Sequence, residues 1–247
     1  MELIQLILIF VVGFGASFIG SIVGGGGLVT IPLLIFIGLP PQIAVATNKF
    51  GSIGMSSGAM SAFWRARKIQ WNYVIPFSIL SVVGASVGAN ILVNIDDAIL
   101  EKAIGIIILA LVPLFFLKKH LGVQRGNPGW RKKTAGYLLY GLVAIWGGFF
   151  GGGSGIMILT VITIFFGMPL INANATNKIP FLLASLTAVF IFAINGIIDL
   201  WIGAVLLVSM YLGGMVGATT AVKRGNKWVK GLFILVIVVS AIKLLFF

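Results

Sequence analysis

The chain has 247 residues, of which 60% are hydrophobic and 9% are charged, whereas an average soluble domain is about 45–50% apolar and about 25% charged. A water-soluble globular protein of this size could not remove so much apolar surface from water, so the composition excludes that class and indicates a protein embedded in a lipid bilayer. The net charge of +12 then favours basic cytoplasmic loops and an anionic ligand over nucleic acid, which we do not expect as a partner.

Apolar runs predict membrane-spanning helices in both halves of the chain. Between the first two runs of each half lies a shorter apolar segment, at residues 28–38 and 156–167, flanked by glycines and prolines. Segment 28–38 would be about 16 Å long as a helix, too short for a hydrocarbon core of about 30 Å. Interrupted helices of this kind indicate a binding site near the bilayer midplane. The long runs lie at about 3–22, 71–93, 98–117, 134–150, 200–222 and 228–246.

The two halves are copies of one unit. Shifting the sequence by 129 positions (176 minus 47) aligns residues 46–49 with 175–178, both reading Ala-Thr-Asn-Lys, and no gap is needed. The identical positions concentrate on glycine, proline and this polar tetrad, which apolar composition alone would not produce. We therefore predict a first transmembrane repeat at 1–117, a basic cytoplasmic linker at 118–133 and a second transmembrane repeat at 134–247.

The charged loops predict that the two repeats insert upside down relative to each other. Basic residues gather at 65–68, in the linker and at 223–230, whereas Asp96, Asp97 and Asp199 occupy the intervening loops. Basic loops face the cytoplasm. Since the basic loop at 65–68 corresponds to the acidic loop ending at Asp199, equivalent loops carry opposite charge. The pattern predicts an all-α polytopic protein of two inverted-topology repeats, in the cytoplasmic membrane, with both termini outside. It leaves open whether 24–64 and 153–193 form re-entrant hairpins or pairs of tilted spans.

The duplicated tetrad contains the strongest candidates for a binding site. A lysine deep in a membrane costs about 2.5–3.5 kcal/mol even on the lenient insertion scale, and every acidic residue lies in a loop or, like Glu101, near the end of a predicted span. An anionic ligand would supply the missing charge, while threonine and asparagine add neutral donors. The alternative is that each lysine reaches the membrane interface and its neighbours cap a helix. Because both repeats keep the tetrad, we favour substrate binding by Thr47, Asn48, Lys49, Thr176, Asn177 and Lys178.

Two glycine clusters beside the short segments complete the predicted site. Unwound glycine backbone leaves N–H groups free to bind an anion at the start of the following helix. We expect Gly25, Gly26, Ser154 and Gly155 to contribute, with Gly26 and Gly155 in unwound backbone. Close helix packing is the alternative, and we assign that role to the glycines at 51–58 and 84–88.

No enzyme or cofactor chemistry is indicated. The chain has no cysteine, and its single histidine, His120, lies in the linker. No predicted span holds His, Cys or Asp, and the one Glu, Glu101, lies near a span end, so no nucleophile with its base and no metal cluster is expected in the spans. We expect no cofactor and no bound metal. Two functions of such a site remain open: a carrier with alternating access, or an anion-selective channel that uses the same residues.

The glycine-rich entries, the short segments, the Gly-Leu-Pro and Gly-Met-Pro turns and the Ala-Thr-Asn-Lys tetrads, all duplicated, resemble the sulfite exporter TauE/SafE family of membrane anion transporters. The resemblance covers essentially the whole chain. It implies export of a small sulfur-containing anion, such as sulfite, a sulfonate or sulfoacetate, across the cytoplasmic membrane. It does not specify the anion, and it leaves the oligomeric state open, a homo-oligomer included.

Overall fold

The computed structural model describes residues 3–96 and 128–246, with side chains up to residue 232. Within these ranges the secondary structure is all helical and contains no strand. The predicted span at 98–117, His120 and most of the predicted linker lie outside the described residues. The helices are α1 (Leu3–Val23), α2 (Gly27–Phe36), α3 (Pro41–Arg65), α4 (Trp71–Asn94), α6 (Trp130–Phe149), α7 (Ser154–Phe166), α8 (Leu170–Ile194) and α9 (Leu200–Phe246).

Helix boundaries recur at the spacing of the sequence repeat. The starts of α3 and α8, the ends of α3 and α8, and the starts of α4 and α9 are all separated by the same offset that aligns the two Ala-Thr-Asn-Lys tetrads. A proline precedes or begins each of α3 and α8, where its fixed φ favours helix initiation and its missing N–H costs nothing. Helix α9 continues past its counterpart through a kink at Gly225, where φ is 83° and ψ is 172°. Helix α6 begins at Trp130, so residues 130–133, predicted as linker, form its first turn.

The protein is membrane-embedded and crosses the bilayer several times. Among the described residues, four helices are long and apolar enough to span a bilayer: Leu3–Val23, Trp71–Asn94, Leu170–Ile194 and Leu200–Leu232. Their outward faces carry large apolar side chains that a soluble protein would bury. On α4, for example, an exposed stripe recurs at every fourth residue through Ile75, Ile79, Val83, Val87 and Ile91. Such a stripe lies on one side of a helix and suits contact with lipid.

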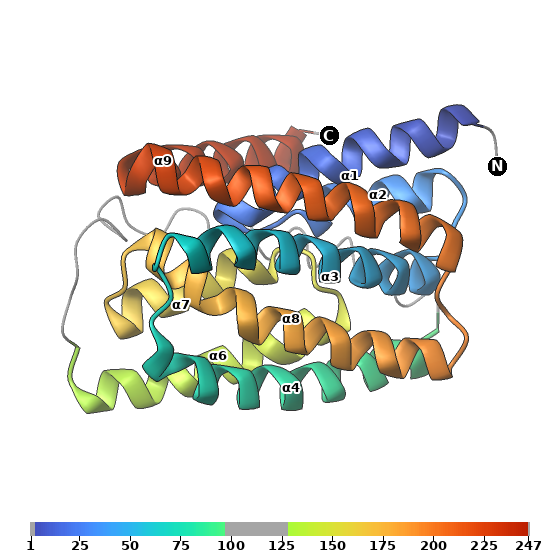
Figure 1. Cartoon of the computed structure of the whole chain (residues 1–247). Helices are drawn as coiled ribbons and strands as arrows, with labels where there is room; N and C mark the ends of the chain where they lie inside the picture. Colours follow the sequence, from blue (N-terminus) through green and yellow to red (C-terminus); the bar gives the residue numbers. More distant parts are fainter. Residues whose placement is uncertain (1–2, 97–127, 247) are drawn as a thin grey trace.

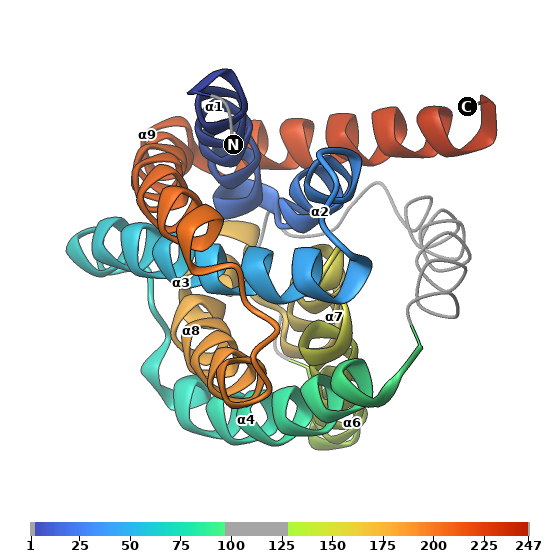
Figure 2. The ribbon, with the colours of Figure 1, turned by 90° about the vertical axis from the view of Figure 1, so that its right-hand side faces the viewer.

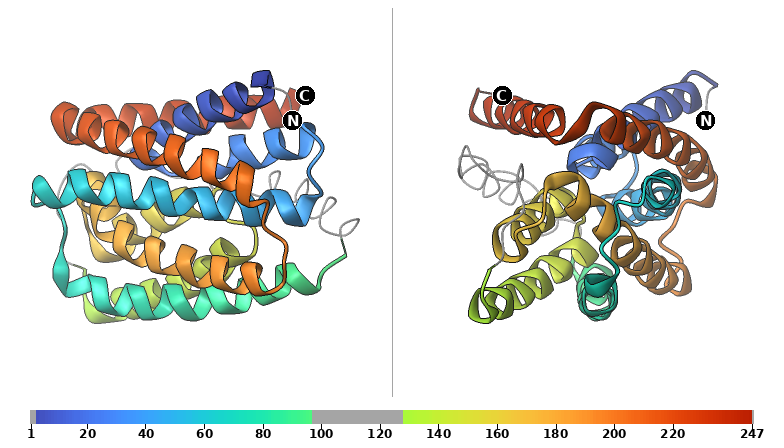
Figure 3. Two further views of the ribbon diagram at one scale, coloured as in Figure 1. Left: turned by 45° about the vertical axis from the view of Figure 1, so that its right-hand side comes forward. Right: turned by 60° about the vertical axis from the view of Figure 1, so that its left-hand side comes forward.

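The helices form a layered bundle with α3 and α8 at its centre. Helices α1 and α9 lie on one side of this pair, and α4 and α6 lie on the other (Figures 1 and 2). The main contacts join helices of different repeats. Helices α1 and α3 pack on α9, and their counterparts α6 and α8 pack on α4, the counterpart of α9. Equivalent helices run in opposite directions, most clearly α3 and α8 (Figures 1 and 3).

Glycines allow the helices of each layer to approach closely. On α4, Gly84 and Gly88 face α6, and a Cβ at Gly88 would overlap the Ile145 carbonyl oxygen. Their counterparts on α9, Gly213 and Gly217, face α1 in the same way. The glycines of 51–58 likewise abut α9. The interpretation of the glycines at 51–58 and 84–88 as packing residues is therefore confirmed.

Two breaks in the helices meet inside the bundle. One break separates α1 from α2, and the other separates α6 from α7. Gly24 has a φ of 85° and Gly153 a φ of 74°, a left-handed conformation that strains any residue with a Cβ. A Cβ on Gly24 would also lie 2.6 Å from the carbonyl carbon of Gly155. Because both breaks are built from glycine, their backbones touch, and the candidate site lies beside this contact.

Candidate functional site

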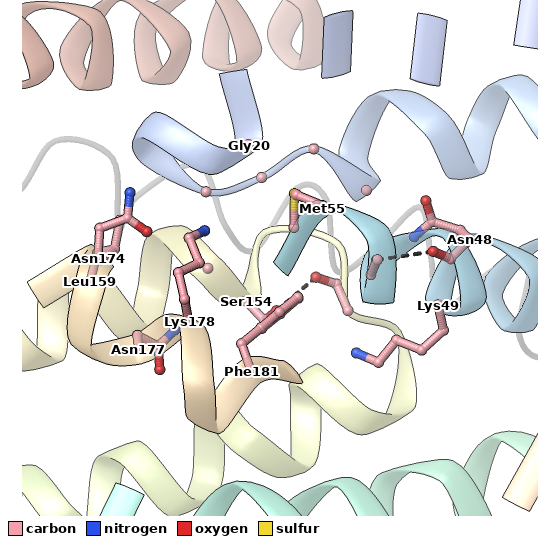
Figure 4. Close-up of a pocket in the computed structure, with 17 residues that line it drawn as sticks. Gly20, Asn48, Lys49, Met55, Ser154, Leu159, Asn174, Asn177, Lys178 and Phe181 are labelled. Carbon is pink, nitrogen blue, oxygen red and sulfur yellow. Dashed lines mark hydrogen bonds between the residues drawn. The ribbon is translucent and has the colours of Figure 1, made fainter. Parts of the chain in front are cut away.

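A pocket lies between the two helix breaks and the central helices α3 and α8 (Figure 4). It brings together eight of the ten residues that the sequence analysis assigned to a site. From the first repeat it is lined by Gly20, Gly24, Gly25, Gly26, Gly27, Asn48, Lys49, Ser52 and Met55. From the second repeat it is lined by Gly151, Ser154, Gly155, Leu159, Asn174, Asn177, Lys178 and Phe181.

The two predicted threonines do not line this pocket. The hydroxyl oxygen of Thr47 accepts a hydrogen bond from the backbone N–H of Asp199 at 3.0 Å. Thr176 accepts one from the backbone N–H of Gln70, also at 3.0 Å. Asp199 and Gln70 are themselves equivalent positions of the two repeats, and they immediately precede α9 and α4. Each threonine therefore fastens the start of a helix in the other repeat.

The backbone of both breaks presents free donors to the pocket. Within the described ranges, no hydrogen-bond acceptor is found for the backbone N–H of Gly25, Gly26, Gly27 or Gly155. These groups stand at the starts of α2 and α7, where unpaired N–H groups and the helix dipole favour an anion. Ser154 Oγ donates to the carbonyl of Gly151 at 2.7 Å.

The expectation of unwound backbone is wrong for Gly155, which is the second residue of α7. Gly26 lies in the break between α1 and α2, as expected, but its dihedrals are helical, with φ −52° and ψ −37°. The left-handed residues are Gly24, Gly25, Gly151 and Gly153. These glycines turn the chain within a few residues, so α2 and α7 begin directly after them. The free N–H groups therefore belong to the first turn of each short helix and to the residues just before it.

The two asparagines of the tetrads are oriented by hydroxyl groups. The Thr30 hydroxyl donates to Asn48 Oδ1, and the Tyr140 hydroxyl donates to Asn177 Oδ1 at 2.7 Å. Tyr140 is held in turn by a 2.9 Å hydrogen bond with Ser81 Oγ. Since the carboxamide oxygens are occupied, the NH₂ group of each asparagine remains as a donor. The Asn48 amide nitrogen lies 3.3 Å from where a Cβ would stand on Gly27.

Lys49 and Lys178 enter the pocket from α3 and α8 (Figure 4). Their side chains are only 3% and 5% exposed, and no carboxylate in the described part of the chain forms an ion pair with either. Lys49 Nζ donates to the carbonyl of Gly147 and lies 5.2 Å from the centre of the Phe181 ring. Two buried cations without acidic partners leave the pocket electropositive.

The structure adds lining residues that sequence reasoning did not select. Asn174, whose counterpart in the first repeat is Val45, donates to the carbonyls of Ser21 and Ile22 at the end of α1. Ser52 and Phe181 also line the pocket. Ser52 lies one helical turn after Asn48 and could have been found from that spacing. Asn174 lies one helical turn before Lys178 and could have been found from the same spacing.

The pocket offers many hydrogen-bond donors and positive charge but no negative charge. Its lining contains no histidine, cysteine or carboxylate, and the hydroxyls of its two serines, Ser52 and Ser154, donate to backbone carbonyls. No group of three or more metal-ligating His, Cys, Asp or Glu side chains occurs among the residues that the structure describes. The chemistry that these residues support is recognition of a small anion.

Comparisons with known proteins point to membrane transport. A family model described as "Sulfite exporter TauE/SafE" matches residues 9–244. A probable membrane transporter protein of Haemophilus influenzae is 33% identical, covering 98% of this chain and 94% of the relative. The probable membrane transporter protein YfcA of Escherichia coli K12 is 28% identical, covering 96% and 88%. No solved structure matches the chain significantly.

Proposed function

We propose that this chain, which belongs to the sulfite exporter TauE/SafE family of membrane transporters, is a secondary transporter for a small sulfur-containing anion. Sulfite, a sulfonate or a sulfoacetate-like compound would bind in the pocket between the helix breaks. The anion would cross the cytoplasmic membrane by alternating access, in which the pocket opens to one side of the membrane at a time.

One observation carries the proposal: two buried lysines and the free backbone N–H groups of two helix starts converge on one pocket whose lining contains no carboxylate. An unpaired buried cation is costly in a membrane, so it normally faces a ligand, a partner or water. An oxyanion offers both the negative charge and several acceptor oxygens for these donors. A cation would meet only repulsion from both lysines.

Alternating access suits two inverted repeats that share one central site. Support comes from the opposed directions of α3 and α8 (Figure 1) and from the exchanged contacts of equivalent helices. In this arrangement the group of α1, α3 and α9 can rock against the group of α4, α6 and α8 around the glycine contact. The proposal places the basic loops in the cytoplasm and both termini outside the cell.

Outward movement is downhill without a coupling ion. An anion that leaves a cytoplasm negative inside gains about 2.3 kcal/mol per charge per 100 mV. For a monoanion this corresponds to more than tenfold in concentration, since about 1.4 kcal/mol is tenfold. The membrane potential therefore suffices to drive export of the proposed substrate.

Flux in proteoliposomes tests the proposal. The purified chain should transport radiolabelled sulfite with saturable kinetics and with counterflow against unlabelled anion, whereas protein-free liposomes should not. Single-channel current steps in planar bilayers, without counterflow, would replace the carrier with an anion channel. Absence of flux for sulfite, methanesulfonate and sulfoacetate alike would overturn transport of a sulfur-containing anion.

A further inference from the structure

We infer that the two buried lysines, identical in sequence context, have different roles: Lys178 supplies the positive charge that binds the anion, and Lys49 is a positioning residue that holds the second helix break. The inference rests on the proposed function, since it divides the work of the same pocket. Nothing in the duplicated tetrad distinguishes the two residues, and the difference comes from their neighbours.

Lys49 already has a partner inside the protein. Its Nζ donates to the carbonyl of Gly147, in the last turn of α6. Carbonyls of the last helical turn lack partners within the helix and carry the negative end of the helix dipole, so a cation there stabilises the helix end. The same Nζ lies 3.3 Å from where a Cβ would stand on Gly151, one of the left-handed residues of the break. Lys49 therefore ties α3 to the break between α6 and α7.

Lys178 has no such partner. It is as deeply buried as Lys49, yet no acceptor for its Nζ is found among residues 3–96 and 128–232. In Figure 4 its side chain extends toward the glycine stretch of the first break, whose free N–H groups line the same pocket. The ammonium group of Lys178 and the N–H groups of the first break are thus hydrogen-bond donors that have no acceptor within the described part of the protein. An oxyanion would satisfy all of these donors at once.

Two unmatched pairs of residues account for the difference. The residue equivalent to Gly147 is Phe18, and its carbonyl already accepts a 2.9 Å hydrogen bond from Ser21 Oγ, whereas the residue equivalent to Ser21 is Phe150, which has no hydroxyl. Asn174 donates to the carbonyls of Ser21 and Ile22 at the end of α1, and its equivalent, Val45, has no polar group. Neutral groups therefore hold the end of α1 and leave Lys178 for the ligand, while Lys49 satisfies the carbonyl at the end of α6.

Replacement of each lysine by methionine separates the two roles. With the purified full chain in detergent and sodium sulfite as the probe, calorimetry should show at least about tenfold weaker binding for Lys178→Met, the loss expected for a hydrogen bond to a charged group. Lys49→Met should lose several times less affinity than Lys178→Met. Lys132→Met, which removes an exposed lysine at the start of α6, controls for the change in net charge.

Thermal unfolding without anion provides a second measurement, in which the two variants should differ in the direction of their change in Tm. Lys49→Met strands the Gly147 carbonyl and should lower Tm by about 2–4 °C. Lys178→Met removes an unpaired buried charge and should leave Tm unchanged or raise it. Should a methionine variant not fold, Lys49→Gln and Lys178→Gln form a second matched pair.

Three outcomes decide between the hypotheses. Stronger loss of binding in the Lys178 variant, with the lower Tm in the Lys49 variant, supports the inference. Equal losses of affinity at both lysines, with wild-type binding intact, overturn the inference and leave the proposed function standing. If the wild-type chain binds neither sulfite nor methanesulfonate, the proposed function fails, and the inference fails with it.

Discussion

Hydroxyl groups decide which atoms the pocket asparagines offer to a ligand. A carboxamide can present either its oxygen or its NH₂ group, and only the NH₂ group attracts an anion. Thr30 occupies the oxygen of Asn48, and Tyr140 occupies the oxygen of Asn177. Because Thr30 corresponds to Leu159 and Tyr140 to Val11 across the repeat, the two halves reach the same orientation with unrelated residues.

The substitution Tyr140→Phe tests this orientation. Phenylalanine keeps the ring that stacks on Phe77 at 4.5 Å but removes the hydrogen bond to Asn177, so the carboxamide is free to turn its oxygen into the pocket. We expect sulfite binding to weaken by about three- to tenfold, the range for one lost hydrogen bond. The control is Ser81→Ala, which leaves the Tyr140–Asn177 bond in place and should have a smaller effect. Wild-type affinity in Tyr140→Phe would contradict the assigned role.

The different placement of threonine and lysine in each tetrad follows from helix geometry. Residues two apart on an α-helix do not share a face, so Thr47 cannot point into a pocket that Lys49 enters. The sequence repeat singles out the threonine and the lysine of each tetrad, and helical periodicity predicts that their side chains point in different directions. Neither shows that the partners of Thr47 and Thr176 are Asp199 and Gln70, because those contacts join segments from different halves of the chain.

Helices and the short segments could be predicted from apolar runs and punctuating residues, and helix boundaries agree within a few residues for α1, α4 and α6. The point at which each short helix restarts could not be predicted. In a run such as Gly24–Gly27 every residue can adopt left-handed dihedrals, so the sequence does not choose among them. Contact between the two breaks makes that choice, and it is a tertiary interaction.

Glycine contacts between α4 and α6 carry a prediction about stability. A Cβ on Gly88 would overlap the carbonyl oxygen of Ile145, and backbone cannot yield as a flexible side chain can. Gly88→Ala should therefore destabilise the protein by about 1–3 kcal/mol, as other overpacked interiors do, and Gly217→Ala should do the same between α9 and α1. Gly15→Ala is the control, because open space surrounds that position and alanine favours helix by up to about 1 kcal/mol. Equal Tm values for Gly88→Ala and Gly15→Ala would refute the close approach.

The exchanged contacts of the whole molecule explain why the two repeats fold as one unit. Each central helix packs on a helix of the other repeat, α3 on α9 and α8 on α4, and each tetrad threonine holds the start of that same partner helix. Neither repeat can bury its inner face alone. The pocket accordingly takes lining residues from both halves of the chain, and it exists only in the assembled pair.

Inverted insertion makes a prediction about the sides of the membrane that equivalent loops occupy. The chain contains no cysteine, so a single introduced cysteine gives an unambiguous label. Ala66 and Asn195 are equivalent positions that follow α3 and α8 directly. If the repeats are inverted, an impermeant maleimide should label Asn195→Cys in intact cells and label Ala66→Cys only after the membrane is opened. The expectation follows from charge: the loop after α3 carries Arg67 and Lys68, whereas the loop after α8 carries Asp199, and basic loops stay in the cytoplasm. Labelling of both cysteines from the same side would rule out inverted repeats, and with them alternating access by rocking of two equivalent helix groups.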